Sequence, residues 1–322
     1  MSVADVVTQI NRYFASCIFI FGCVGNILNI LVLSQRTLRS NSCASLFLGS
    51  SIAGLCSLIA GLTPRMLSGI AVDLSETNQI LCKFRGFTLF TSRAIAFWLI
   101  MLATIDRWLL SCPDVHRRHL STIKNSNRST AVVVFLSIIL HSECFYCYNS
   151  NLVNTPGKCF SNGIVCRLIN DMLFAACTIL IPLCVMTTFG FLTLGNIRRA
   201  RNQIHSGQIS VASQNKGTAA IRSKRSKKTD HRLLIMLLVQ VVLLAMLTIP
   251  SSIEKFYSTL TADVVKSTSR AATENLIYNS ALLLTYLANG IPFYVYTLSG
   301  GSVFRKAFFD LIRTITRKVI GR

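Results

Sequence analysis

The residues best suited to chemistry lie at the two ends of one apolar stretch, which begins at Cys82 and ends at Asp106-Arg107-Trp108. A cysteine forms disulfides in an oxidising compartment, and an Arg beside an Asp can exchange one ion-pair partner for another. A helix of the 25 residues from Cys82 to Arg107 is about 37 Å long and crosses a hydrocarbon core about 30 Å thick. We therefore expect a membrane span with one oxidising and one cytosolic end.

A further charge, Arg93, lies eleven residues into the same stretch. A charge at this depth costs on the order of 2.5–3.5 kcal/mol on insertion scales, so it should have a partner or a wet cavity. The acids expected near the outer rim are Asp171, Glu254 and Glu274. Two interpretations remain open for Arg93, namely structural pairing with one of these acids and binding of an acidic or carbonyl-rich group of a ligand.

The elements that must position these residues follow from composition. Of the residues, 52% are hydrophobic and only 14% are charged, whereas soluble domains carry about 25% charge. Seven apolar runs near membrane length leave too little polar surface for a soluble protein, and backbone groups in lipid must pair within helices. The sequence therefore predicts an all-α membrane protein, a bundle of seven transmembrane helices at residues 14–33, 45–67, 84–110, 130–148, 168–194, 233–253 and 276–298.

The distribution of Lys and Arg predicts the orientation of the bundle. Most of these 33 residues lie in segments that are cytosolic if the N-terminus is outside, including ten between residues 198 and 232 and six after residue 304. This asymmetry places the N-terminus outside and the C-terminus inside. The net charge of +21 could suggest nucleic-acid binding. Because the cations border membrane spans, anionic lipid and an acidic cytosolic partner explain the charge better.

The order and spacing of several residues resemble the rhodopsin-like (class A) G-protein-coupled receptors over nearly the whole chain. These receptors keep a cysteine 25 residues before the arginine of their Asp-Arg-Tyr motif, and Cys82 and Arg107 have this interval. The third span and the Phe-x-x-Tyr ending are similar to those of invertebrate neuropeptide receptors of the FMRFamide-like kind. The residues that carry the resemblance are Gly25, Asn26, Cys82, Asp106, Arg107, Trp108, Pro182, Pro250 and the segment 289–296.

The resemblance implies an extracellular N-terminus at residues 1–13, a seven-transmembrane receptor domain at 14–299, and a cytoplasmic amphipathic helix and tail at 300–322. It implies a receptor of the plasma membrane that is not an enzyme and uses no cofactor or metal. Its partners would be an extracellular peptide or other small ligand, a heterotrimeric G protein and membrane lipids, and no nucleic acid. Two alternatives stay open: a membrane transporter or channel, and a seven-helix protein that does not signal.

The resemblance also implies a switch at the inner end of the third span. Asp106, Arg107 and Trp108 would face the G protein. Asp230 would hold Arg107 in the inactive state, and Tyr296 would swing in beside Arg107 on activation. The residues alone leave two other interpretations open. Arg107 could reach the lipid headgroups with Asp106 as its counter-ion, and Asp230 could simply neutralise its basic neighbours.

Four features depart from the family pattern, one of which is the absence of the usual Trp from the fourth span. Gly54 stands where the second span of the family carries a sodium-binding Asp. The sixth span reads Leu-Thr-Ile-Pro up to Pro250 where the family has Cys-Trp-x-Pro, and in the seventh span the proline is shifted by one residue relative to Tyr296. We expect structural roles, in helix contacts and bends, for Asn26, Pro182 and Pro292.

The cysteine pattern predicts at least one disulfide. Cys82 begins the third span on the oxidising side, and the loop between spans four and five offers Cys159 and Cys166 as partners. We favour Cys82–Cys159, because Cys159 lies in a turn-rich and more central part of the loop. Cys166 remains an alternative, as does a second bridge that uses Cys144 or Cys147.

For the ligand pocket we expect Arg93, Leu89 and Pro250. Amine receptors of the family carry an Asp at the position of Leu89, so a monoamine ligand is disfavoured. The prolines of spans five and six predict bends that open a cavity. After the seventh span, apolar residues at helical spacing among basic ones predict a short interfacial eighth helix through Phe304, Phe308, Leu311 and Ile315.

Overall fold

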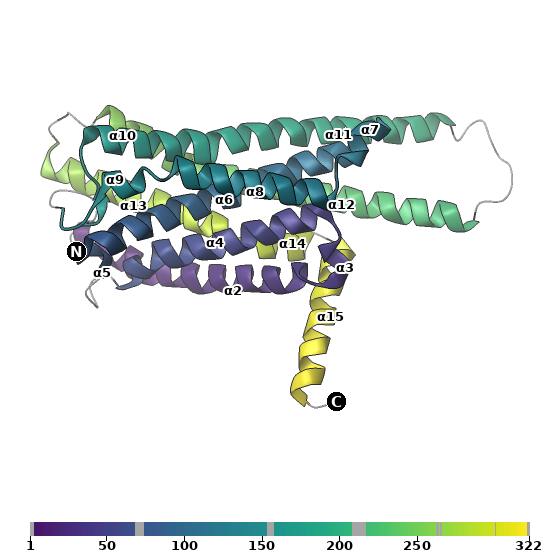
Figure 1. The fold of residues 1–322 in the computed structure, drawn as a ribbon, viewed down its shortest axis with the longest axis horizontal. Helices are drawn as coiled ribbons and strands as arrows, with labels where there is room; N and C mark the ends of the chain where they lie inside the picture. The colour runs from purple at the N-terminus through teal and green to yellow at the C-terminus, as the bar shows by residue number, and fades with distance from the viewer. Residues whose placement is uncertain are drawn as a thin grey trace.

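The chain forms an elongated bundle of helices, which run side by side along the long axis (Figure 1). The computed structural model describes residues 3–67, 74–152, 158–207, 217–261, 264, 266–299 and 301–320. Six helices of this described part are long and apolar enough to cross a membrane, and one pair bent by 50° makes up to seven. The predicted all-α, seven-helix membrane bundle is therefore confirmed.

The elements follow one another as α1 (Val3–Gln9), the π-helix η1 (Ile10–Phe14), α2 (Ala15–Leu33), α3 (Arg36–Arg39), α4 (Ser42–Leu67), α5 (Leu74–Thr77), α6 (Gln79–Ser111), α7 (Val115–His119), α8 (Ile123–Leu140), α9 (Cys144–Cys147), β1 (Tyr148–Asn149), β2 (Phe160–Ser161), α10 (Ile164–Met172), the π-helix η2 (Leu173–Leu180), α11 (Ile181–Gly207), α12 (Gly217–Leu260), α13 (Thr268–Gly290), α14 (Pro292–Ser299) and α15 (Gly301–Ile320). The strands form a two-stranded antiparallel sheet that pairs Tyr148 with Ser161.

Several helices begin earlier than the apolar runs predicted. Helix α8 starts at Ile123 because the Thr122 hydroxyl accepts a hydrogen bond from the Asn125 amide, and α6 starts at Gln79 because the Asn78 side chain caps it. The chain is also helical from Val3 onward, within the segment expected as a polar N-terminus. Hydrophobic patterning misses such polar ends because caps, rather than apolar side chains, determine where helices begin.

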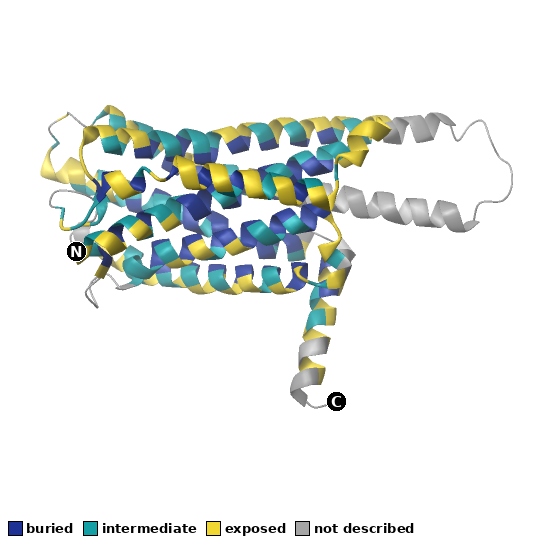
Figure 2. Cartoon of the chain, viewed as in Figure 1, coloured by how far each residue is buried: buried dark blue, intermediate teal, exposed yellow. Residues whose placement is uncertain are grey.

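Buried residues lie on the inner faces of the helices, and exposed ones lie on the outer faces (Figure 2). Helix α6 is buried along much of its length, with Phe97, Leu99 and Ala103 all nearly inaccessible. On the outer face of α8, Phe135 and Leu136 are exposed. Large apolar side chains on the outside and packed ones on the inside are what a bundle surrounded by lipid requires.

Two of the three prolines expected to bend helices mark irregular points in the spans. Pro292 opens α14 directly after the break at Ile291, where a missing N–H costs no helical hydrogen bond. Pro182 follows η2, in which the regular i to i−4 pattern is replaced by wider π turns. Pro250 lies inside α12. Pro292 and Pro182 thus accompany a break in the seventh span and a π segment in the fifth, whereas α12 continues through Pro250 without a break.

Asn26 connects three spans in the middle of the bundle. Its side-chain nitrogen donates to the carbonyl oxygens of Gly22 at 2.8 Å and of Asn289 at 3.0 Å. A Cβ atom at Gly54 would lie 3.2 Å from the Asn26 side-chain oxygen. The position at which the family has an acid is therefore filled by a close approach of α2 to α4.

Candidate functional sites on helix α6

One end of the bundle, which we call the disulfide end, is covered by the β1–β2 hairpin. The Cys82–Cys159 disulfide attaches the hairpin to the start of α6, which is the pairing that the sequence favoured. A second disulfide, Cys147–Cys166, joins the residue before β1 to α10. The sequence had left this second bridge open. Together the two bridges hold the hairpin across the end of the bundle.

The turn from β2 into α10 needs a glycine. Gly163 has a φ of +82°, a conformation that residues with a Cβ atom rarely adopt, and its place at the start of α10 redirects the chain. Just before this turn, Phe160 of β2 lines the cavity that lies beneath the hairpin.

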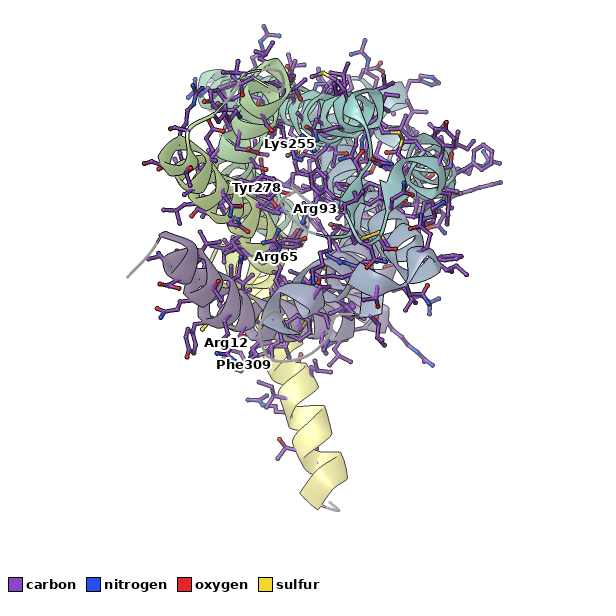
Figure 3. The ribbon with its side chains drawn as sticks, turned by 90° about the vertical axis from the view of Figure 1, so that its left-hand side faces the viewer. Arg12, Arg65, Arg93, Lys255, Tyr278 and Phe309 are labelled. Atoms are coloured by element: carbon purple, nitrogen blue, oxygen red, sulfur yellow. A yellow bond between two sulfur atoms is a disulfide. The ribbon has the colours of Figure 1, made fainter. Side chains whose placement is uncertain are left out.

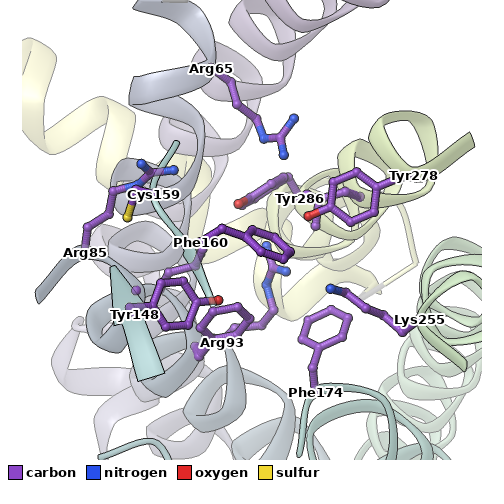
Figure 4. A pocket seen from close by; sticks show the side chains of 14 residues that line it. Arg65, Arg85, Arg93, Tyr148, Cys159, Phe160, Phe174, Lys255, Tyr278 and Tyr286 are labelled. Carbon is purple, nitrogen blue, oxygen red and sulfur yellow. The ribbon is translucent and has the colours of Figure 1, made fainter. Parts of the chain in front are cut away.

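Beneath the hairpin lies a cavity of about 100 Å³, whose lining side chains are seen from close by in Figure 4. Figure 3 looks onto this end of the bundle and labels four of the lining residues, Arg65, Arg93, Lys255 and Tyr278. This volume holds several waters or one large side chain of a ligand. Four cations line it, and they come from three helices: Arg65 of α4, Arg85 and Arg93 of α6, and Lys255 of α12. The other lining residues are Gly86, Leu89, Phe90, Tyr148, Cys159, Phe160, Phe174, Tyr278, Leu282 and Tyr286.

Arg93 lies at the cavity with its side chain only 1% exposed. The Cζ atom is 4.3 Å from the ring centre of Tyr286 and 5.5 Å from that of Phe174, so the cation meets two aromatic faces. None of its three side-chain nitrogens has a hydrogen-bond partner among the described residues. A buried guanidinium with unused donors is an unusual arrangement, because such groups are normally paired.

Of the three acids that the sequence suggested for Arg93, Asp171 and Glu274 have other partners, and Glu254 makes no hydrogen bond to the side-chain nitrogens of Arg93. Asp171 accepts a hydrogen bond of 2.7 Å from Lys255, and this ion pair is almost fully buried. Glu274 pairs with Lys266 and Arg270 near the start of α13. The expectation of a pairing with Asp171 or Glu274 is therefore not met, because the faces of α10 and α13 that carry these acids meet other cations.

The remaining cations of the cavity use their donors within the protein. The Arg65 Nη1 atom donates to the side-chain oxygens of Asn11 at 2.9 Å and of Asn279 at 2.7 Å. Arg85 donates to the hydroxyl of Ser75 at 2.7 Å and to the carbonyl of Ala60. These bonds anchor the rim of the cavity, whereas Arg93 is held by aromatic faces.

Tyr148 supplies no negative charge to the cavity. Burial raises the pKa of its phenol well above the ordinary value, so the side chain stays neutral at physiological pH. No Asp or Glu lines the cavity among the described residues. The cavity is therefore positively charged with aromatic walls, which suits an anionic group that carries an apolar neighbour.

Of the expected pocket residues, Leu89 and Arg93 line the cavity and Pro250 does not. Pro250 is exposed on α12, five residues before Lys255. Five residues rotate a helix by about 140°, so two residues at this spacing lie on different faces. Pro250 can therefore act on the pocket only through the shape of α12, and Lys255 is the residue of this helix that reaches the cavity.

The opposite end of α6, which we call the Asp-Arg end, holds a hydrogen-bonded network. The Asp106 Oδ1 atom accepts from the hydroxyls of Ser42 at 2.8 Å and of Ser121 at 2.6 Å. The Arg107 Nη2 atom donates to the side-chain oxygen of Asn41 at 2.8 Å and lies 3.4 Å from Asp106 Oδ2. Both charged side chains are buried, and the network joins α6 to the start of α4.

The other residues proposed for the switch lie in different surroundings. Asp230 belongs to α12, but its side chain is outside the described residues. Trp108 packs against Phe189 with ring centres 4.9 Å apart, and Tyr296 is buried between Phe47 and Phe304. In this conformation Tyr296 thus belongs to the apolar core beside α15, whose first turns bury Phe304.

Sequence reasoning missed several residues of both sites. Asn41, Ser42 and Ser121 carry no motif, and the one signal that could have pointed to Asn41 is the preference for Asn directly before the first residue of a helix. Tyr286 and Lys255 lie on apolar spans whose rotation the sequence does not give. Within the described residues no cluster of three or more His, Cys, Asp or Glu side chains could hold a metal ion.

Comparison with known proteins gives one family. The model of the 7 transmembrane receptor (rhodopsin family) matches residues 25–291, which is most of the chain and includes both ends of α6. No individual curated protein matches the chain significantly.

Proposed function

Because the chain belongs to the rhodopsin family of seven-transmembrane receptors, we propose that it is a G-protein-coupled receptor of the plasma membrane with its N-terminus outside the cell. The two disulfides at one end support this orientation, since disulfides persist in oxidising compartments. The excess of Lys and Arg in the segments at the opposite end supports it as well. The disulfide end then faces the outside and the Asp-Arg end faces the cytosol.

We propose that the ligand is a peptide that enters beneath the β1–β2 hairpin. The observation that carries this proposal is the cavity at the disulfide end, whose buried Arg93 lies on the same helix as the Asp106–Arg107 network. A peptide supplies carbonyl and carboxylate oxygens for the cations and side chains for the aromatic walls. Helix α6 provides a rigid connection from the cavity to the network.

Signal transfer requires a two-state element at the Asp-Arg end. In the proposed resting state, Arg107 is held by Asp106, by Asn41 and by Asp230 of α12. Ligand binding favours an outward motion of the cytosolic half of α12 about the region of Pro250. Arg107 then loses Asp230, turns toward the G protein, and gains Tyr296 as a neighbour.

The test is a G-protein activation assay in cells with a library of short peptides, each prepared with an amidated and a free C-terminus. We expect at least one peptide to activate the wild-type receptor. Arg107→Ala should abolish the response, and Asp230→Ala should raise basal activity. Arg128→Ala is the matched control, because Arg128 is an exposed cation near the start of α8, at the same end, and takes no part in the described hydrogen bonds of Asp106 and Arg107.

Two results would contradict the proposal. One is a full response of Arg107→Ala, which would remove the assigned coupling site. The other is ligand-dependent solute or ion flux without G-protein activation, which would favour the transporter or channel alternative. Surface expression of every variant must be measured alongside, so that loss of signal is not confused with loss of receptor.

A further inference from the structure

Four cations and no described carboxylate line the cavity beneath the hairpin, and they are not equivalent. Lys255 is neutralised by Asp171, and Arg65 and Arg85 donate to side-chain and carbonyl oxygens. Arg93 alone among these four makes no described hydrogen bond from its side-chain nitrogens. The cavity therefore contains one cation whose hydrogen-bonding capacity the described protein leaves unused.

The surroundings of Arg93 determine what can use that capacity. Phe174 and Tyr286 contact the guanidinium through their ring faces, which attract the charge but accept no N–H···O hydrogen bond of normal strength. A guanidinium is planar and carries five N–H donors, and two of these match the two oxygens of a carboxylate. In a site shielded from water such a charged, two-point contact is stronger than one to a neutral oxygen.

We infer that Arg93 binds a carboxylate of the ligand, and that the apolar group next to this carboxylate packs among Phe160, Phe174 and Tyr278. Figure 4 shows these rings around the cavity, with the ammonium of Lys255 directed toward its interior. This inference rests on the proposed function, because it assigns a chemical class to the ligand of the same cavity. The carboxylate belongs either to the C-terminus of a peptide or to a small organic acid.

Free acids and primary amides should bind to Arg93 with different affinities. A C-terminal amide offers one carbonyl oxygen and directs its NH2 group toward the donors of Arg93. A carboxylate offers two acceptors and a full negative charge. A charge-assisted hydrogen bond is roughly twice as strong as a neutral one, so we expect a free acid to bind about tenfold more tightly than its amide, or more.

The experiment measures thermal stabilisation of the purified full-length receptor by matched pairs of compounds. Each pair is a free acid and its primary amide. One arm contains N-acetylated tripeptides ending in each amino acid, and the other contains small acids such as 3-phenylpropionate. Dose dependence of the melting temperature gives the affinity ratio within each pair. The arm that contains the best acid identifies the source of the carboxylate.

Three variants test the role of Arg93. Arg93→Gln should remove the preference for the acid, and Arg93→Lys should retain part of it, because a lysine keeps the charge but lacks the planar fork. Lys158→Gln is the matched control: Lys158 is a 65% exposed cation at the same end, does not line the cavity, and pairs with Glu76. It should keep the full preference.

The outcomes are distinct from those of the signalling test. A library in which no acid exceeds its amide, or an acid preference that persists in Arg93→Gln, overturns the inference. Activation by an amidated peptide with no response to any acid leaves the proposed receptor function intact and also overturns the inference. Stabilisation by an acid that depends on Arg93, without G-protein activation, supports the carboxylate site and contradicts the coupling proposal.

Discussion

Arg93 and Arg107 lie on the same helix, α6, and both side chains are almost fully buried, yet their surroundings differ in kind. Arg107 contacts the carboxylate of Asp106 and the side-chain oxygen of Asn41. Arg93 contacts the faces of Tyr286 and Phe174. The protein thus supplies an acid and an amide oxygen to Arg107, whereas no described residue accepts a hydrogen bond from the side-chain nitrogens of Arg93.

The difference teaches how one helix can serve two tasks. A charge that is paired within the protein stabilises a particular arrangement of helices, and it signals only when that arrangement changes. A charge without a hydrogen-bond partner makes the protein less stable, and a ligand that supplies the partner recovers this free energy as affinity. Substitution of the two arginines should therefore change the stability of the receptor in opposite directions.

The sharpest test of this comparison is the same substitution at both positions. Arg107→Met should destabilise the receptor by about 3–5 kcal/mol, because Asp106 is left as a buried charge without its cation. Arg93→Met should instead stabilise the ligand-free receptor by about 1 kcal/mol, since the cost of the buried charge (about 2.5–3.5 kcal/mol) exceeds the lost cation–π attraction (about 0.5–2 kcal/mol). Melting temperatures of the purified variants provide the measurement.

Asp106→Asn controls for the first variant, because it removes the negative charge while keeping the shape. Combined with Arg107→Met, it should recover part of the lost stability. A lower melting temperature for both methionine variants would contradict the comparison, since it would mean that Arg93 has a stabilising partner of its own.

The second largest effect is expected from the covalent links of the disulfide end. Cys82–Cys159 closes a ring with a sequence separation of 77, and Cys147–Cys166 one of only 19. In the chain-entropy account the longer ring contributes about 4–5 kcal/mol and the shorter one about 3 kcal/mol. Replacing both cysteines of a pair by serine should therefore reduce surface expression and melting temperature more for the first pair.

The two pairs should also differ in ligand binding. Cys159 lines the cavity beside Phe160, whereas Cys166 lies outside it. Loss of the first bridge should abolish stabilisation by ligand, and loss of the second should weaken it. Equal loss of ligand binding in both double variants would show that both bridges support binding by holding the hairpin in place. The contact of Cys159 with the cavity would then make no separate contribution.

Apolar run length made the spans and their order predictable, although it missed the capped polar starts of α6 and α8, and the cysteine pattern favoured Cys82–Cys159. Contacts between helices were not predictable in the same way. Each residue turns a helix by about 100°, so a small error in rotation brings a different side chain to the neighbour. For this reason the sequence suggested Asp171 as a partner of Arg93, although Asp171 forms its ion pair with Lys255 of α12.

A third prediction concerns the ring that holds Arg93. A Cβ atom added at Gly61 would overlap the ring and hydroxyl of Tyr286. Gly61→Ala should therefore displace Tyr286 from Arg93 and cost about 1–3 kcal/mol, the usual range for overpacking. The preference for free acids over amides should fall with it. Gly195→Ala is the control, because nothing lies near its added Cβ and alanine favours the helix by about 1 kcal/mol.

The smallest effect is expected at Asn41, where the pairing of Arg107 can be strengthened rather than removed. The Asn41 side-chain oxygen accepts from Arg107 and from the backbone amides of Cys43 and Ala44 at the start of α4. Asn41→Asp keeps these acceptors and adds a negative charge next to Arg107 and the positive end of the helix, which together contribute about 1 kcal/mol. The resting arrangement should become more stable, so basal G-protein activation should fall.

Asn41→Ala removes the same contacts and should raise basal activation, and loss of the cap should lower the free energy of unfolding by about 1 kcal/mol. Basal signalling per receptor at the cell surface, measured for both variants against wild type, distinguishes the two directions. If Asn41→Asp raised basal activation instead, the added charge would be drawing Arg107 into an active arrangement. Asn41 would then be a partner of Arg107 in the signalling state. The pairing of Arg107 within the protein would no longer identify the resting state.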